Sequence, residues 1–366
     1  MKKTIVILSN PFGYGPTGKA IAIAKEFIRS GYTNIVFAGN SFTREIVPSS
    51  IGSIGVDERS EESIKDLLKT IQNPVVISSQ NRFAIKAAIS LKIPCAFLDG
   101  LSWFWKEIPA DHFIADEIFW MNYPGIEEKI TKSPHLINIV PTIVDVESTN
   151  PIRDQILIHL GGCKNPLVDV FPKNYLDILT TSLLKVSDQW KIKVTGGAEA
   201  MDYLNSIFLL DKKNKVDALS LNHDEFVREL DRSQHFVTTA GQTATLEAFA
   251  LGIPTSFLLP MNLSQLALTD LLSQHNACPQ HLRWDCYSTT KTNIPLTEKD
   301  AIVSFNGLVD TIKEGKEICK KLEDDIARLI ETVPDIDGQR LFIEKIGIGG
   351  AAVIREILTQ KWGLEV

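Results

Sequence analysis

The sequence predicts an α/β protein of two domains whose parallel sheets face each other across a cleft. Short apolar runs alternate with amphipathic helical segments along the chain, which is the pattern of parallel sheets covered by helices on both faces. A polar stretch at residues 145–154 interrupts this series once, and the series then starts again. The chain of 366 residues is also longer than a single hydrophobic core usually supports.

In the first half, we expect strands at the short apolar runs and helices between several of them. The predicted strands are residues 4–8, 34–38, 74–77, 94–98, 112–115 and 136–140. The predicted helices are residues 18–30, 61–71 and 82–91. Because helical crossovers make successive strands parallel, residues 1–148 are expected to form an N-terminal Rossmann-like domain.

The second half repeats this pattern. The predicted strands are residues 155–160, 191–195, 216–219, 235–238 and 254–258. The predicted helices are residues 173–187, 224–233, 243–251 and 264–275. Residues 155–345 are therefore expected to form a C-terminal Rossmann-like domain, with ligands bound at the carboxyl ends of its strands.

Composition excludes several classes of function. A net charge of −7 argues against nucleic acid as a partner, since nucleic-acid surfaces need a basic excess. The five cysteines are scattered without metal-binding spacing, which favours a reducing compartment. No apolar run reaches the roughly 18 residues of a transmembrane helix, and the N-terminal one is too short for a signal peptide. We therefore expect a cytoplasmic protein, and we leave its oligomeric state open.

The most informative segment begins at residue 236. A strand runs into Ala240 and Gly241, and Gln242 and Thr243 open a helix. The N–H groups of a first helical turn and the positive end of the helix dipole bind anions, and a glycine lets a phosphate approach the backbone. Glu247 shares a helix face with Thr243 and lies about 9 Å along the axis from Gly241, which is about the step from a pyrophosphate to its ribose. The segment predicts a nucleotide-diphosphate site.

This segment resembles the donor-binding region of GT-B glycosyltransferases. It is closest to the plant-type UDP-glycosyltransferases and to the N-acetylglucosaminyltransferase of peptidoglycan lipid-intermediate synthesis. The shared pattern is Ala240-Gly241, Thr243, Thr245, Glu247, Gly252-Ile253-Pro254, Pro260 and Gln265. The resemblance implies that Glu247 holds the ribose and Gln265 the hydroxyls of the donor sugar. It also implies that a helix near residues 350–366 packs back on the first domain.

The same resemblance implies the reaction. A sugar would move from a nucleotide diphosphate, with UDP as the default, to a hydroxyl of a small-molecule or lipid-linked acceptor. Inversion at the anomeric carbon follows from the family alone. No cofactor or metal is expected, and no cluster of histidines has metal-binding spacing.

Glycines at two further strand ends support the donor site. Gly161-Gly162-Cys163-Lys164 follows the first strand of the second domain. Similar enzymes have a glycine-rich loop there that touches the diphosphate, so Gly162 and Lys164 are predicted donor-binding residues. Gly196 ends the next strand and is predicted to contribute to the same site. Glycine pairs after strands are common in any α/β protein, so they support the prediction without carrying it.

The loop after the first strand permits two interpretations. Gly13, Gly18 and Lys19 match most of a Walker A phosphate loop, but Ala20 replaces the Ser or Thr that would hold Mg²⁺. The GT-B resemblance instead implies a glycine-rich loop on the acceptor side, with Gly13, Gly15 and Thr17 as its predicted site residues.

That loop lacks the histidine that many of these enzymes carry. Asp99, at the end of the predicted strand 94–98, is therefore the predicted catalytic base, although capping of the following turn would also account for it. Trp103 heads an aromatic cluster that stacks on an acceptor or simply packs in the core. Among the histidines, His223 is singled out for testing, and His112 is treated as structural.

Two further functions remain open. One is a nucleotide-sugar hydrolase or epimerase on the same scaffold, and the other is a non-catalytic nucleotide-sugar-binding subunit. Turnover of a UDP-sugar separates these alternatives from sugar transfer.

Overall fold

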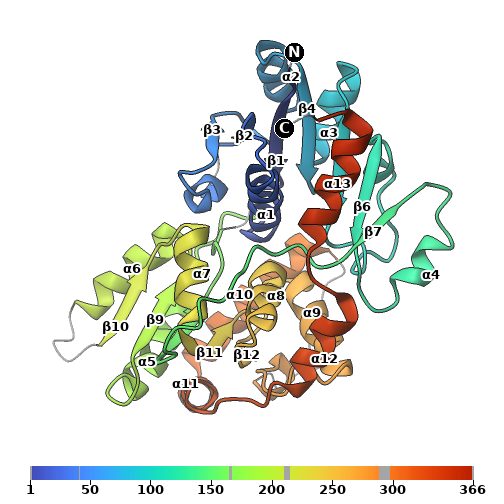
Figure 1. Cartoon of the computed structure of the whole chain (residues 1–366). Coiled ribbons are helices and arrows are strands. Elements are labelled where there is room, and N and C mark those ends of the chain that lie inside the picture. Colours follow the sequence, from blue (N-terminus) through green and yellow to red (C-terminus); the bar gives the residue numbers. More distant parts are fainter. Residues whose placement is uncertain (1, 41, 165–166, 210–214, 288–296, 365–366) are drawn as a thin grey trace. The chain divides into compact units, whose positions relative to one another are not determined.

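The computed structural model describes residues 2–40, 42–164, 167–209, 215–287 and 297–364. It divides the chain into two compact units (Figure 1). The first unit consists of Met1–Asp145 and Ile343–Val366, and the second is Val146–Phe342. Each unit contains one parallel sheet.

The sheet of the first unit has the order β3-β2-β1-β4-β5-β6-β7. Its strands are β1 (Thr4–Ser9), β2 (Ile35–Ala38), β3 (Gly52–Ile54), β4 (Pro74–Ser79), β5 (Cys95–Asp99), β6 (Glu117–Met121) and β7 (Asn138–Val140). The strand order reverses direction between β1 and β4. Ligands of open α/β sheets bind outside the carboxyl ends of the strands at such a switch point.

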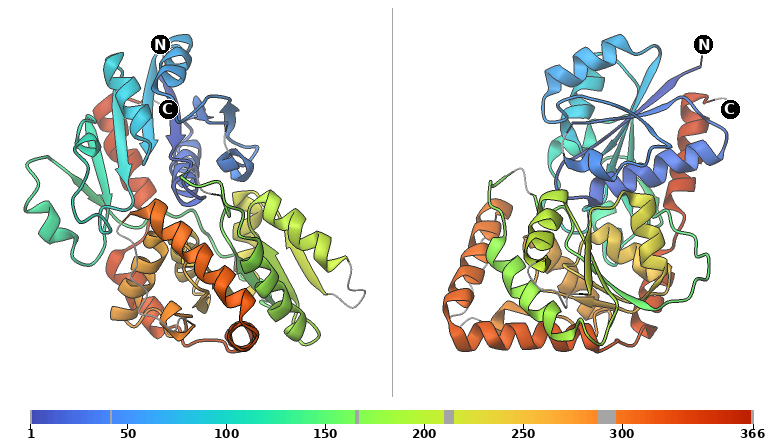
Figure 2. Two further views of the ribbon diagram at one scale, coloured as in Figure 1. Left: turned by 180° about the vertical axis from the view of Figure 1, so that it is seen from behind. Right: turned by 90° about the vertical axis from the view of Figure 1, so that its left-hand side faces the viewer.

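Helices cover both faces of this sheet (Figure 2). They are α1 (Gly15–Arg29), α2 (Glu61–Thr70), α3 (Arg82–Ser90), α4 (Ile126–Ile130), α13 (Gly350–Trp362) and the 3-10 helices η1 (Phe42–Ile46) and η2 (Ala110–Phe113). Helix α13 packs against α1, and α2 packs against α3. The apolar core lies between these helices and the buried strands.

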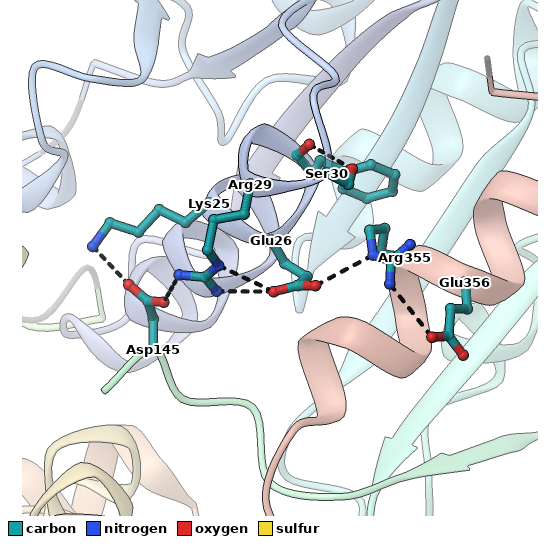
Figure 3. Close-up of polar contacts among 8 residues, drawn as sticks. Lys25, Glu26, Arg29, Ser30, Asp145, Arg355 and Glu356 are labelled. Carbon is teal, nitrogen blue, oxygen red and sulfur yellow. Dashed lines mark hydrogen bonds and ion pairs between the residues drawn. The ribbon is translucent and has the colours of Figure 1, made fainter. Parts of the chain in front are cut away.

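Helix α1 is joined by ion pairs both to the end of the unit's first segment and to α13 (Figure 3). Asp145 accepts from Lys25 at 2.6 Å and from Arg29 at 2.5 Å. Glu26 accepts from Arg29 at 2.9 Å and from Arg355 at 3.3 Å. The segment that leaves the unit and the helix that returns to it are therefore held by neighbouring residues of one helix.

The sheet of the second unit has the order β10-β9-β8-β11-β12, with its switch point between β8 and β11. Its strands are β8 (Gln155–His159), β9 (Ile192–Thr195), β10 (Val216–Leu219), β11 (Ser233–Thr238) and β12 (Thr255–Phe257). The helices are α5 (Lys173–Val186), α6 (Ala198–Phe208), α7 (His223–Asp231), α8 (Gln242–Ala250), α9 (Leu263–Gln274), α10 (Glu298–Glu314), α11 (Lys316–Glu331) and the 3-10 helix η3 (Trp284–Cys286). Helix α12 (Asp337–Ile346) begins in this unit and ends in the first.

The predicted fold class of two Rossmann-like α/β domains is confirmed, but one predicted strand is wrong. Residues 112–115 were expected to form a strand, whereas His112 lies in the 3-10 helix η2 and the strand is β6, a few residues later. The carboxylate of Asp116 accepts from the backbone N–H of Cys95 at 2.8 Å, so the chain is anchored just before β6 begins. The longer aromatic run of β6 then pairs with β5.

A buried histidine should make the second unit sensitive to acid. His235 of β11 is fully buried, with Nδ1 at 3.1 Å from the carbonyl of Ile330 and Nε2 at 2.9 Å from Oγ of Ser256. Burial lowers the pKa of His235 from 6.5 to about 4. Between these two values only the unfolded chain takes up the proton, so stability is fully present above pH 6.5 and falls as the pH drops toward 4.

We predict that His235 contributes to this loss of stability at acid pH. From pH 7 to pH 5 it should lower the free energy of unfolding of the second unit by about 2 kcal/mol. Urea unfolding at both pH values should show a smaller loss in His235→Gln than in the wild type. The exposed His135 provides the control variant His135→Gln. Equal losses in all three proteins would contradict the prediction.

Candidate functional site

In the second unit, two glycine-containing turns lie at the switch point, because β8 and β11 are neighbours. Gly161 and Gly162 follow β8, and Ala240 and Gly241 follow β11. Ala240 has φ of 55°, in the left-handed region, and Gly241 is the N-cap of α8. Among the described residues, no side chain caps this helix, and a Cβ at Gly241 would meet none of their atoms within 4 Å. The backbone at the start of α8 is therefore approachable at Gly241.

The helix that starts here carries a buried carboxylate. Glu247 is 1% exposed, and its Oε1 lies 2.7 Å from Nε2 of His223, the first residue of α7. Asn222 and Glu225 form a capping box at that end of α7, which fixes the position of His223. Within the described residues, Oε2 of Glu247 and Nδ1 of His223 have no hydrogen bond. The pair therefore presents a carboxylate held in one orientation with one oxygen still able to accept.

Gln265 lies at the same end of the sheet. Asn262 caps α9 by accepting from the backbone N–H of Gln265 at 2.9 Å. The side-chain oxygen of Gln265 accepts from the backbone N–H of Met261 at 2.7 Å, and its amide nitrogen donates to Oγ1 of Thr239 at 3.3 Å. Thr239 directly follows β11. The structure thus brings Gln265 to the strand end from which α8 starts, where Gln242 and Thr243 form the first turn.

The other predicted donor residues have packing roles in the structure. Lys164 is about half exposed and pairs with Glu199 at 3.1 Å. A Cβ at Gly196 would lie 3.0 Å from the carbonyl oxygen of Gly161, and a Cβ at Gly197 would lie 2.2 Å from that of Gly162. The two glycine pairs therefore touch backbone to backbone. This contact accounts for the glycine at Gly196 without a ligand.

In the first unit, the loop after β1 leads directly into α1. Gly13 has φ of 65°, and α1 begins at Gly15. Oγ1 of Thr17 lies 2.8 Å from Oγ of Ser9, and Thr17 is fully buried. Thr17 therefore ties the helix start to β1.

The Walker A interpretation is wrong. A Walker A loop wraps around phosphates before its lysine, with the helix starting near that lysine. Here Gly18 and Lys19 already lie inside α1. Lys19 is 1% exposed and donates to the carbonyl of Gly15 at 3.4 Å, and a Cβ at Gly100 would lie 3.2 Å from its Nζ, so its ammonium lies between the start of α1 and the turn after β5.

Asp99, at the end of β5, is 0% exposed. One carboxylate oxygen accepts from the backbone N–H of Leu101 at 2.8 Å, and the other lies 2.9 Å from Nδ1 of His112. The ring of His112 packs against Phe97 and Trp105, and within the described residues its Nε2 has no hydrogen bond. The arrangement is a histidine whose ring is oriented by a carboxylate.

The role of His112 could not be predicted from the sequence, because Asp99 and His112 are 13 positions apart and meet only through the turn after β5. No spacing rule connects them, and the wrong strand at 112–115 placed His112 in a sheet.

Lys129 of α4 stabilises the turn that follows β5. Its Nζ donates to the carbonyls of Ser102 at 2.7 Å and Trp103 at 2.9 Å, and also to that of Trp105. Burial lowers the pKa of Lys129, while the charge of Asp99 acts in the opposite direction. Trp103 stacks on Tyr123 with ring centroids 5.2 Å apart. The aromatic segment beside Asp99 is therefore held in one conformation.

Two other features are absent from the described residues. No helix in those parts of the chain is long and apolar enough to cross a membrane. In the same residues, no group of three His, Cys, Asp or Glu side chains could hold a metal ion.

The structure is similar to solved structures at low sequence identity. The O. sativa protein Os79 in complex with UDP matches with a TM-score of 0.59 at 10% identity, over 98% of this chain and 100% of that chain. A Listeria monocytogenes protein proposed to be a UDP-N-acetylglucosamine 2-epimerase matches with a TM-score of 0.53 at 13% identity, over 100% and 98%. Phytolacca americana UGT2 complexed with UDP-2-fluoro-glucose and pterostilbene matches with a TM-score of 0.51 at 13% identity, over 99% and 100%.

These similarities define the class of fold. The chain has the GT-B fold of two Rossmann-like domains, as the sequence resemblance predicted. The sequence matches no protein-family profile, and no curated protein matches it in sequence.

The buried pair in the second unit should be energetically coupled. Removing one partner of a buried pair leaves the other without compensation, so we predict that His223→Ala lowers the free energy of unfolding by about 3 kcal/mol. Glu247→Ala should have an effect of similar size. The double variant should lose less than the sum of the two, by at least about 1 kcal/mol. Urea unfolding of the four proteins measures this coupling, and strictly additive losses would show that the pair contributes nothing.

Proposed function

We propose that the protein is a glycosyltransferase that moves a sugar from a UDP-sugar to an acceptor hydroxyl, with inversion and without a metal. The observation that carries the proposal is Glu247, a carboxylate buried in the helix that starts at the switch point of the second sheet. Its Oε1 is bound to His223 at 2.7 Å, while its Oε2 makes no hydrogen bond within the described residues. That geometry suits a pair of ribose hydroxyls.

The remaining donor contacts follow from this position. The first turn of α8 at Gly241, together with the loop at Gly162, would hold the diphosphate through backbone N–H groups. These groups would stabilise the charge of the leaving UDP. The helix dipole would supply the compensation that a divalent cation supplies in other enzymes. Gln265 would bind hydroxyls of the sugar.

The acceptor would bind in the first unit, beside Trp103. The acceptor oxygen attacks the anomeric carbon, the bond from that carbon to the β-phosphate oxygen breaks, and UDP leaves. Nε2 of His112 takes the acceptor proton. Asp99 accepts a hydrogen bond from the N–H of Nδ1 of His112. This bond fixes the tautomer of His112, and the carboxylate stabilises the imidazolium that forms. Asp99 thus keeps a part in catalysis, as a positioning residue for His112.

A second candidate is an epimerase or hydrolase of UDP-sugars. The structural similarity to the Listeria monocytogenes protein, which is proposed to be an epimerase, supports this second candidate. Incubation with UDP-glucose and with UDP-N-acetylglucosamine, each with and without a panel of hydroxyl acceptors, separates the functions. Acceptor-dependent release of UDP supports transfer, while free sugar or an epimer without acceptor supports the alternative. Binding of UDP without any product would support a non-catalytic nucleotide-sugar-binding subunit.

Glu247 provides the first prediction of this proposal. Glu247→Gln should weaken UDP binding by about 1–3 kcal/mol, because a charged acceptor is lost from the ribose contact. Calorimetry measures the dissociation constant, and circular dichroism verifies that the variant is folded. Glu317→Gln, an exposed position on α11, is the matched control. Unchanged UDP affinity in the folded variant would remove Glu247 from the ribose site.

His112 provides the second prediction. His112→Asn should lower kcat by about 10²- to 10⁴-fold, which is the typical contribution of a general base. The affinity for UDP should stay within twofold of the wild type, because His112 lies in the first unit. His135→Asn, at an exposed position, should keep full activity. Normal turnover of His112→Asn would refute this assignment of the base.

A further inference from the structure

Glu298, the first residue of α10, is a carboxylate that the proposed mechanism does not use. Both of its oxygens are buried, and neither has a hydrogen bond of acceptable geometry within the described residues. Leaving a buried acceptor unpaired costs about 1–3 kcal/mol, and more when the group is charged. Buried polar groups without partners are rare in native structures, so each one needs an explanation.

The position of Glu298 relates it to the proposed donor site. The backbone N–H groups of Leu263 and Ser264, at the start of α9, lie close enough to favour its charged form. Burial has the larger effect and raises the pKa of Glu298 to about 7. The next residue of α9 is Gln265, the proposed ligand of the sugar hydroxyls. Helix α10 packs against α9, so Glu298 lies at the start of the helix that carries Gln265.

Gln265 alone is poorly equipped to bind a hexose. A glutamine amide has two N–H donors and an oxygen with two lone pairs. Gln265 already uses one lone pair for Met261 and one N–H for Thr239. One donor and one acceptor position remain, whereas a hexose presents several hydroxyls. A carboxylate next to this amide would add up to four acceptor positions.

We propose that Glu298 is a specificity-determining residue of the donor site and accepts hydrogen bonds from hydroxyls of the transferred sugar. The assignment rests on the proposed function, since it assumes that a UDP-sugar lies over α8. Glu298 recognises the sugar and not the nucleotide. Its removal therefore affects UDP-sugars and spares UDP.

Calorimetry with UDP, UDP-glucose and UDP-N-acetylglucosamine tests this separation. For each protein, the dissociation constant of the UDP-sugar that binds more tightly is divided by the dissociation constant of UDP to give a ratio. In Glu298→Gln, this ratio should rise at least tenfold while the affinity for UDP stays within twofold of the wild type. Glu314→Gln makes the same charge change at the exposed far end of α10 and should leave the ratio unchanged.

A role limited to capping α9 predicts different results. Glu298→Gln would then lower the melting temperature and either weaken UDP and the UDP-sugars equally or weaken neither, and both results overturn the proposal. Glu298→Asp keeps the charge at the helix start but withdraws the carboxylate by one methylene. It should still raise the ratio at least threefold, and an unchanged ratio also overturns the proposal.

Wild-type behaviour distinguishes failure of this assignment from failure of the proposed function. If the wild type binds neither UDP nor the UDP-sugars, the proposed function falls and the role of Glu298 falls with it. If the wild type binds UDP and the ratio is the same in wild type and Glu298→Gln, only the role of Glu298 is refuted.

Discussion

Burial of charged groups at strand ends constrains the architecture of both candidate sites. Glu247 is buried in a helix made mostly of small and apolar residues, and an unpaired carboxylate would be costly there. His223 meets this requirement, and the capping box of α7 fixes where His223 can lie. The hydrogen bond between His223 and Glu247 therefore fixes the position of α7 relative to α8. The approachable backbone at Gly241 and the carboxylate of Glu247 belong to one helix, whose geometry sets the distance between them.

In the first unit, a buried carboxylate is likewise paired with a histidine. Asp99 ends a buried strand and is paired with His112 from the turn that follows. Lys129 binds three carbonyls of that turn, which prevents it from moving away. In both units a histidine and a carboxylate lie at the carboxyl end of a parallel sheet, where this class of fold binds its ligands.

The sequence predicts the parts of this structure that depend on local chemistry. The buried strands and the start of α8 follow from apolar runs and from Gly241, so they are found within a few residues of their predicted bounds. The partner of Asp99 could not be predicted, because it is set by how the chain turns after β5. The packing roles of Thr17 and Gly196 were also missed, since each depends on a segment distant in the sequence. Local pattern indicated where a site lies, and tertiary contacts decide which side chains are available in it.

The number of hydrogen-bond partners separates the roles open to the three buried carboxylates. Asp99 is fully buried and each of its oxygens has one partner, which suits the proposed role of orienting His112. Glu247 has one oxygen occupied and one that makes no hydrogen bond within the described residues, so it can be oriented by the protein and still contact a ligand. Glu298 has no hydrogen bond of acceptable geometry to the rest of the described chain, so both of its oxygens can still accept. Since each missing bond has a cost in the free protein, the carboxylate with the fewest partners has the most to gain from binding.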